Sequence, residues 1–158
     1  MKKKHIVVII CGVIVLFLVG LVVTQTMFMF KNNKDATKVE YRMERKPIED
    51  RFPELPNFTE CYWKANTIGY ANFGPTSYWM RGFLCLDEKA LQKILADYDW
   101  NADTVIFPKG IDPAITGKSG FSWYSNKNFQ LVILRQRFVG SIYLDTANGV
   151  LYFDVENN

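Results

Sequence analysis

Carboxylates concentrate between residues 97 and 112, and they are the first candidates for chemistry. The four are Asp97, Asp99, Asp103 and Asp112. A pair of carboxylates can act as general acid and general base on a glycosidic bond. The same stretch begins like an EF-hand calcium loop, but Ala102 replaces the glycine of the sharp turn and Pro108 replaces the bidentate glutamate. The pattern therefore favours solvated carboxylates over a metal site.

A second stretch, residues 112–119, resembles a phosphate-binding loop because it ends in Gly-Lys-Ser. That motif begins with a glycine, whereas Asp112 stands at the equivalent position and its charge would repel phosphate. Pro113 also removes a backbone donor from the phosphate cradle. The sequence therefore predicts an exposed loop here and no nucleotide partner.

Histidine and cysteine restrict the chemistry further. The single histidine, His5, precedes a long apolar stretch, so we expect no histidine-dependent catalysis, metal ligation or pH switch in the folded part. Without a neighbouring histidine, neither Cys61 nor Cys85 is expected to be a catalytic nucleophile. These two cysteines could form a disulfide in an oxidising compartment, or remain buried thiols in a reducing one. The sequence leaves both outcomes open and predicts no metal and no cofactor.

The charge distribution argues against nucleic acid as a partner. The 158 residues carry 19 Lys and Arg against 16 Asp and Glu, a formal charge of +3. Lys2–Lys4 account for that whole excess, so residues 31–158 are neutral. Nucleic-acid-binding domains carry a clustered basic patch, which a neutral composition does not predict.

Residues 6–30 contain no charged side chain. About 20 apolar residues in a helix span the hydrocarbon core of a bilayer, and this stretch exceeds that length. A cleaved signal peptide has a shorter apolar region that ends at small residues. Here the stretch ends at the bulky residues 27–30. We therefore expect an uncleaved transmembrane helix that anchors the chain in the bilayer.

The flanking charges predict the orientation of this helix. Lys2–Lys4 lie close to the membrane, which favours a cytoplasmic N-terminus, although the other flank also carries basic residues. We expect a cytoplasmic tail over residues 1–5 and a stalk over 31–47, in which Pro47 breaks any helix. Residues 48–158 would then form one extracytoplasmic domain at the cell membrane.

The pattern of this domain predicts an α+β fold in which a small antiparallel sheet is packed by one α-helix. Alternating or continuous apolar runs predict strands over residues 58–64, 68–73, 78–86, 129–138, 140–145 and 150–155. We expect a turn at Asn66 between the first two. The run over 78–86 is apolar on both faces, which predicts a central, buried strand.

Two local sequence signals each predict a particular element of structure. Asp87 is a natural N-cap for a helix with apolar residues at helical spacing. The expected stripe comprises Leu91, Ile94, Leu95 and Tyr98. Asn148 and Gly149 lie between two apolar runs and both tolerate positive φ, which predicts a hairpin.

Residues 99–120 predict a long loop rich in proline and glycine. Long loops within compact domains are usually functional or mobile. Aromatic residues are dense at 121–124, directly after this loop, and at 73–79, which would neighbour it if both project from the same end of the sheet. These rings either fill the core or offer large contact areas. Mixed charge around an aromatic anchor is typical of a binding surface. The expected contact residues are Lys109, Asp112, Lys118 and Trp123.

The leading functional hypothesis is a non-catalytic, membrane-anchored module that binds or regulates another envelope protein, as an accessory subunit, inhibitor or immunity factor. The alternative is an envelope carbohydrate-binding protein or hydrolase that uses the aromatic loops and the 97–112 carboxylates. Exposure of Trp79, Trp123 and Tyr124 distinguishes them, because a buried ring cannot stack on a sugar.

Overall fold

The structure, a computed structural model, describes residues 40–68 and 77–157. The expected transmembrane helix over 6–30 lies outside these residues, as do most of the expected stalk and most of the strand expected at 68–73. Among the described residues, no helix combines the length and apolar character needed to cross a bilayer.

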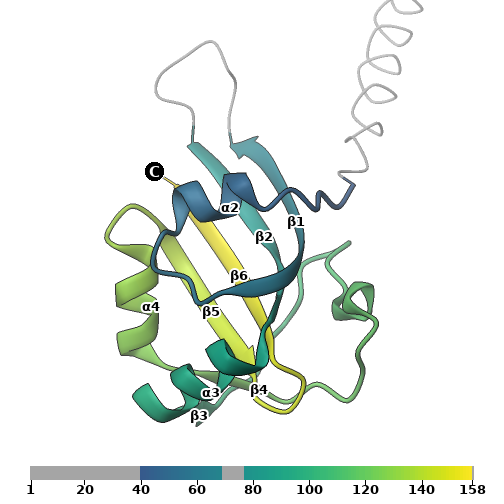
Figure 1. The fold of residues 1–158 in the computed structure, drawn as a ribbon. Coiled ribbons are helices and arrows are strands. Elements are labelled where there is room, and N and C mark those ends of the chain that lie inside the picture. The colour runs from purple at the N-terminus through teal and green to yellow at the C-terminus, as the bar shows by residue number, and fades with distance from the viewer. Residues whose placement is uncertain (1–39, 69–76, 158) are drawn as a thin grey trace, which may run out of the picture. The chain divides into compact units, whose positions relative to one another are not determined.

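The described chain forms an antiparallel sheet of six strands in the order β1-β2-β6-β5-β4-β3 (Figure 1). The strands are β1 (Phe58–Ile68), β2 (Ser77–Leu86), β3 (Asn101–Ala102), β4 (Trp123–Ser125), β5 (Val139–Asp145) and β6 (Val150–Asn157). The predicted α+β class with an antiparallel sheet is confirmed. The central position predicted for residues 78–86 is also confirmed, because β2 lies between β1 and β6.

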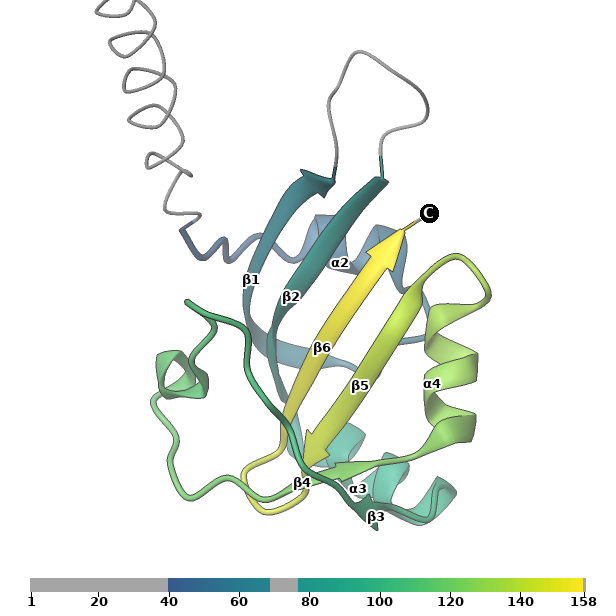
Figure 2. The ribbon, with the colours of Figure 1, turned by 180° about the vertical axis from the view of Figure 1, so that it is seen from behind.

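Helices cover one face of this sheet, and an irregular segment covers the other. The helices are α2 (Lys46–Arg51), α3 (Glu88–Asp97) and α4 (Lys127–Leu134), with a short 3-10 helix, η1 (Pro113–Thr116). Figure 1 shows α2 and α3 in front of the sheet, with α4 beside β5. Figure 2 shows the chain between β3 and β4, including η1, on the opposite face.

Two apolar clusters lie on the two sides of the sheet. The cluster under the helices includes Ile48, Phe52, Met80, Leu84, Ile94, Phe129, Ile133, Leu144 and Phe153. The cluster under the irregular segment consists of Phe83, Cys85, Ile111, Trp123, Val150 and Tyr152. Because both faces of β2 and β6 are covered, these strands read as apolar runs in the sequence.

Helix α3 forms as its sequence predicts. The Asp87 side chain accepts a hydrogen bond from the Ala90 N–H at 2.7 Å, which caps the helix and lowers the pKa of Asp87. Ile94 is buried against the sheet, and the other three residues of the stripe are partly buried there. The predicted stripe is therefore the face that packs on the sheet.

The strand predicted over residues 129–138 is wrong, because α4 occupies most of this range. The Asn126 side chain accepts a hydrogen bond from the Phe129 N–H at 2.9 Å and caps the helix. Phe129, Ile133 and Leu134 then bury one side. An apolar run does not by itself distinguish a strand from a buried helix. The described domain consequently has three α-helices, where the sequence predicted one.

Pro47 begins a helix and does not break one. It lies in the first turn of α2, where its missing N–H leaves no hydrogen bond unmade. The segment before it also belongs to the fold. Arg42 and Trp63 exchange two backbone hydrogen bonds of 2.7 and 2.9 Å, and Tyr41 packs on the second cluster. The described fold therefore begins before residue 48.

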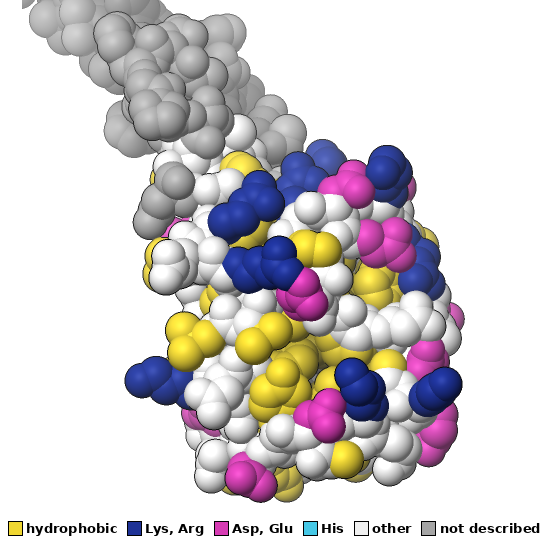
Figure 3. All heavy atoms as spheres, turned by 60° about the vertical axis from the view of Figure 1, so that its left-hand side comes forward, with side chains coloured by type: hydrophobic (Ala, Val, Ile, Leu, Met, Phe, Trp, Pro, Cys, Tyr) yellow, Lys and Arg dark blue, Asp and Glu magenta, His cyan; other side chains and the backbone are white. Residues whose placement is uncertain are grey.

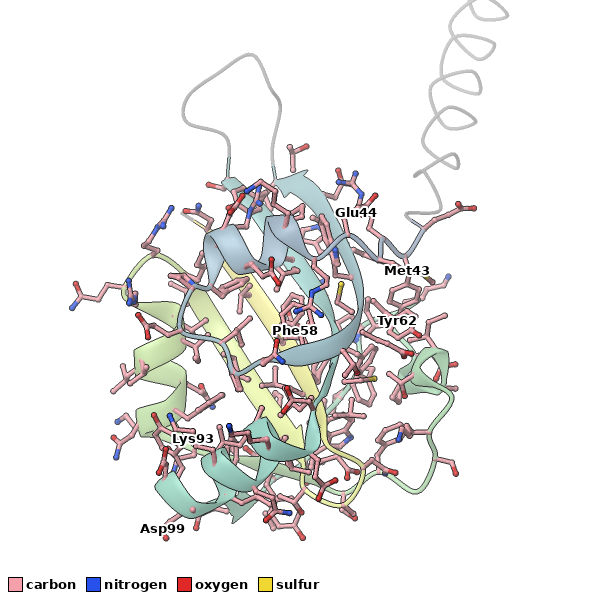
Figure 4. All side chains as sticks on the ribbon, in the orientation of Figure 1. Met43, Glu44, Phe58, Tyr62, Lys93 and Asp99 are labelled. Atoms are coloured by element: carbon pink, nitrogen blue, oxygen red, sulfur yellow. The ribbon has the colours of Figure 1, made fainter. Side chains whose placement is uncertain are left out.

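The first strand is also longer than predicted. β1 continues through Asn66, which pairs with Trp79 of β2, so no turn occurs at Asn66. Beside β1, the Trp63 indole donates to the Glu44 carbonyl at 3.0 Å, and the Cys61 thiol donates to the Met43 carbonyl at 3.1 Å. Figure 4 shows Met43 and Glu44 on the segment that leads into α2. These bonds fix that segment on the edge of the sheet.

The disulfide considered for Cys61 and Cys85 is not formed, although β1 and β2 are neighbours. Both thiols are free and buried. Cys61 pairs with Leu84, one residue from Cys85, and adjacent residues of a strand point to opposite faces. Cys61 therefore lies under the helices and Cys85 lies in the second cluster.

The hairpin between β5 and β6 is confirmed. Gly149 adopts a φ of 65°, in the left-handed region, whereas the structure gives Asn148 no positive φ. Asp145 is fully buried at the start of this turn and accepts hydrogen bonds from the N–H groups of Ala147 and Asn148 at 3.0 and 2.7 Å. Its other oxygen accepts from the Ser122 N–H at 2.7 Å.

Candidate functional site

The predicted contact residues do not all lie on the surface. Lys109, Asp112 and Lys118 are exposed on the segment that covers the second face. Trp123 is only 9% exposed and stacks on Phe121, with ring centroids 5.3 Å apart. Trp123 is therefore part of the core, and its ring is not accessible as the expected anchor.

This segment is fastened to the sheet by several polar contacts. The Lys64 ammonium donates to the Gly110 carbonyl at 2.8 Å, and the Asp112 N–H donates to the Tyr41 hydroxyl at 3.0 Å. The Asp112 carboxylate accepts from the Ala114 N–H at 2.9 Å and caps η1. The exposed charges of the loop are thus presented from an ordered segment.

The carboxylates between residues 97 and 112 are exposed, and several make local contacts. Asp97 pairs with Lys93 of α3 at 3.8 Å. Asp103 accepts a hydrogen bond from the adjacent Thr104 N–H at 2.7 Å. Among the described residues, no group of three or more His, Cys, Asp or Glu side chains is arranged to hold a metal ion.

A polar cluster lies on the second face, at the end of the sheet beyond the covering segment. Arg81 pairs with Asp154 at 2.6 Å and lies 4.8 Å from the centre of the Trp79 ring. The Tyr152 hydroxyl donates to Asp154 at 3.3 Å. Burial of Tyr152, with the adjacent negative charge, raises the pKa of its hydroxyl. Arg81, Tyr152 and Asp154 line a groove of about 340 Å³. Arg81 already neutralises the Asp154 carboxylate in this groove.

A second groove, of about 420 Å³, lies between α3, α4 and the segment that enters β1. Its floor is apolar and includes Leu55, Ile94, Tyr98, Phe129 and Ile133, with charged side chains at the rim. Figure 3, which brings the α4 side of the molecule forward, shows hydrophobic side chains gathered in the middle of this face. Lys93, labelled in Figure 4, belongs to the rim.

Three exposed apolar side chains lie on α4 and at the start of β5. Leu131 is 63% exposed, Val132 45% and Val139 64%. Exposed apolar side chains that gather at one place mark interaction surfaces more often than scattered ones do. We call these three residues the α4–β5 surface. The sequence does not predict this surface, because the apolar run over residues 129–138 favours a strand.

A third groove, of about 770 Å³, runs between α4 and β5. The residues that line it are Lys127, Gln130, Leu131, Leu134, Arg135, Gln136, Phe138, Val139 and Gly140. Its charged lining residues, Lys127 and Arg135, are both basic. Arg135 also pairs with Glu54 of the segment after α2. The groove therefore has a largely apolar lining, with the charge of Arg135 paired and that of Lys127 in no ion pair among the described residues.

The turn that closes this groove has an unusual backbone. Arg135 and Gln136 have φ values of 46° and 58°, in the left-handed region that non-glycine residues rarely adopt. Strained backbone of this kind is concentrated at binding and catalytic sites. The turn places Phe138 in the core and leaves Val139 exposed at the first position of β5.

No protein-family model, curated protein or solved structure matches this chain. The assignment of a functional site therefore rests on the geometry of the described residues. By that measure the α4–β5 surface and its groove are the strongest candidate, because they combine exposed apolar side chains, a strained turn and charge of one sign.

Proposed function

We propose that this chain is a membrane-anchored, non-catalytic module that binds another protein of the cell envelope through the α4–β5 surface. Residues 6–30 would hold it in the bilayer with the N-terminus in the cytoplasm and the folded domain outside. The observation that carries the proposal is the exposure of Leu131 and Val139, which both line an apolar groove, with the exposed Val132 next to Leu131 in α4.

Partner binding would remove the exposed apolar side chains of the α4–β5 surface from water. Fully burying an exposed aliphatic side chain gains about 1.5–3 kcal/mol, and these three, which are 45–64% exposed, would each gain roughly half of that. Protein interfaces place such apolar groups at the centre and charged groups at the rim. Lys127 and Arg135 occupy rim positions here. Partner binding therefore requires no rearrangement of the core.

The carbohydrate-binding alternative has less support from the geometry. The Trp123 ring is buried, and the Arg81 guanidinium covers one face of the partly buried Trp79 ring. Tyr124 is also partly buried, so none of the three rings is fully exposed to a sugar. The exposed Lys109, Asp112 and Lys118 remain a predicted second contact surface. They lie on the segment that covers the other face of the sheet.

Site-specific photo-crosslinking in intact cells tests the proposal. A photoreactive phenylalanine analogue would replace Leu131 in one variant, Ile106 in a second and Lys118 in a third. Ile106 is a control for apolar exposure alone, because it is 89% exposed and lies on the covering segment, at the other groove that Val139 lines. We expect one discrete protein adduct from position 131 and none from position 106.

Three other results would contradict this assignment. An adduct from position 118 alone would move the interface to the loop. Lipid adducts from position 131 would make the α4–β5 surface a membrane contact. Equal adducts from positions 131 and 106 would indicate non-specific contact. The orientation is checked separately with protease added to intact spheroplasts, where we expect digestion of the domain.

A further inference from the structure

The outer edge of β5 has free backbone groups beside the α4–β5 groove. β5 pairs with β6 along its whole length, but β4 pairs only with Tyr143–Asp145. Among the described residues, no strand pairs with the outer side of the first half of β5. An unpaired strand edge is a template for one more strand.

The alternation of an antiparallel strand identifies the groups that point outward. Neighbouring residues direct their N–H and C=O groups to opposite sides of a strand. The carbonyl of Ile142 points outward, because it accepts a hydrogen bond from the Gln130 side chain at 3.2 Å. In regular strand geometry the groups of Gly140, two residues earlier, point to the same side, although Gly140 itself has a φ of 147°.

Helix α4 forms the other wall of this edge. Figures 1 and 2 both show α4 alongside β5, and the groove between them is lined by Leu131, Leu134 and Phe138. An extended chain placed here would bond to β5 through its backbone. Its side chains on one face, every second residue, would contact the apolar lining.

The charges of the groove select the kind of chain. Lys127 and Arg135 are eight residues apart on α4, which corresponds to about 12 Å of helix or about four residues of a strand. No acidic residue lines the groove. Arg135 is paired with Glu54, so the Lys127 end has the positive charge that is not engaged in an ion pair among the described residues.

We propose that the partner binds through an extended, apolar peptide segment that carries a carboxylate and adds to the sheet along β5. This proposal rests on the function proposed above and specifies how the same site works. The peptide backbone bonds to Gly140 and Ile142, the Gln130 amide leaves the Ile142 carbonyl, and the carboxylate pairs with Lys127. Strand addition of this kind takes its affinity from the backbone and its specificity from alternate side chains.

The probe is a random dodecapeptide display library, selected against the full chain in detergent micelles. Peptides that also bind the Leu131→Glu variant are removed. We expect the selected peptides to alternate apolar residues and to carry at least one acidic side chain or a terminal carboxylate. Synthetic peptides amidated at one carboxylate at a time distinguish these two sources.

Three measurements on the best synthetic peptide test the binding mode and the charge pairing. N-methylation of every second amide should weaken binding about tenfold in one register and little in the other, because only one set of amides faces β5. Bound peptide should slow amide hydrogen exchange at Gly140 and Ile142. The Lys127→Glu variant should bind the peptide at least about two- to fivefold more weakly than the wild type does. The Lys109→Glu variant should bind the peptide as tightly as the wild type does.

The failures of the two proposals are distinguishable. If position 131 captures a protein partner but no peptide slows exchange at Gly140, the interface stands and strand addition is overturned. If both N-methylation registers bind equally, strand addition is overturned as well. Selected peptides without any carboxylate, or unaffected by Lys127→Glu, overturn the charge assignment. If no adduct forms at position 131, the proposed function itself fails.

Discussion

The Asp145 carboxylate accepts a hydrogen bond from the Ser122 N–H at 2.7 Å, and this bond joins the end of β5 to the end of the segment that covers the second face. Asp145 also accepts two bonds from the backbone of the following turn. One buried carboxylate therefore holds both the hairpin and the covering segment.

Replacing Asp145 with alanine should lower the free energy of unfolding by about 3 kcal/mol, because three backbone N–H donors lose a charged, buried acceptor. Chemical denaturation of the full chain in detergent, followed by tryptophan fluorescence, measures this. The exposed Asp99→Ala is the control and should change stability by less than about 0.5 kcal/mol. Equal midpoints for the two variants would show that Asp145 has no such role.

Trp123 is expected to act through packing. Trp123→Ala should destabilise the domain by about 3–5 kcal/mol, since a large buried ring is lost next to Phe83, Phe107 and Tyr152. Trp79→Ala, at a partly exposed position, should cost clearly less. If the Trp123 variant keeps wild-type stability but loses partner binding, the residue is an interface anchor after all.

The free thiol of Cys61 should make stability depend on alkaline pH. Burial raises its pKa to about 11 in the fold, whereas an unfolded thiol ionises near 9. The folded state therefore keeps a proton that the unfolded state loses. This contribution is fully present below pH 9 and is lost as the pH rises through 11.

Denaturation midpoints between pH 8 and pH 11 measure the effect. The decline should be shallower in the Cys61→Ala variant than in the wild type. Burial also raises the pKa of Cys85, so native alkylation of both thiols at pH 8 should be slow. A faster-migrating band on a non-reducing gel would show a disulfide and contradict the free thiols.

Gly82 allows β1 and β2 to approach. A Cβ at this position would lie 2.3 Å from the Tyr62 carbonyl oxygen and 2.6 Å from the Trp63 Cα, both backbone atoms. We expect Gly82→Ala to destabilise the domain by about 3 kcal/mol or more through overpacking.

Gly117→Ala is the control for Gly82→Ala. Thermal or chemical unfolding measures the stability of both variants. A Cβ at Gly117 meets no atom within 4 Å, so the cost is that of its positive φ, about 1 kcal/mol. A smaller effect at position 82 than at position 117 would contradict the close approach of the strands.

Local signals in the sequence are sufficient to predict a helix and a turn of the fold. The cap at Asp87, the apolar stripe of α3 and the glycine turn before β6 were predicted because each depends on residues a few positions apart. The antiparallel α+β class followed from the same patterns. Residues 129–138 were mistaken for a strand, because a short apolar run suits a strand and a buried helix equally, and the Asn126 cap was not recognised.

The candidate site depended on tertiary structure. The residue types follow from the sequence alone: it has no histidine after His5, it is neutral beyond the apolar stretch, and it has two cysteines after that stretch. Tertiary contacts place Cys61 and Cys85 on opposite sides of the sheet, bury Trp123 and leave Leu131 exposed. The physical reason is that exposure depends on strand register and on which segments cover each face, and these are set by contacts between residues far apart in the chain.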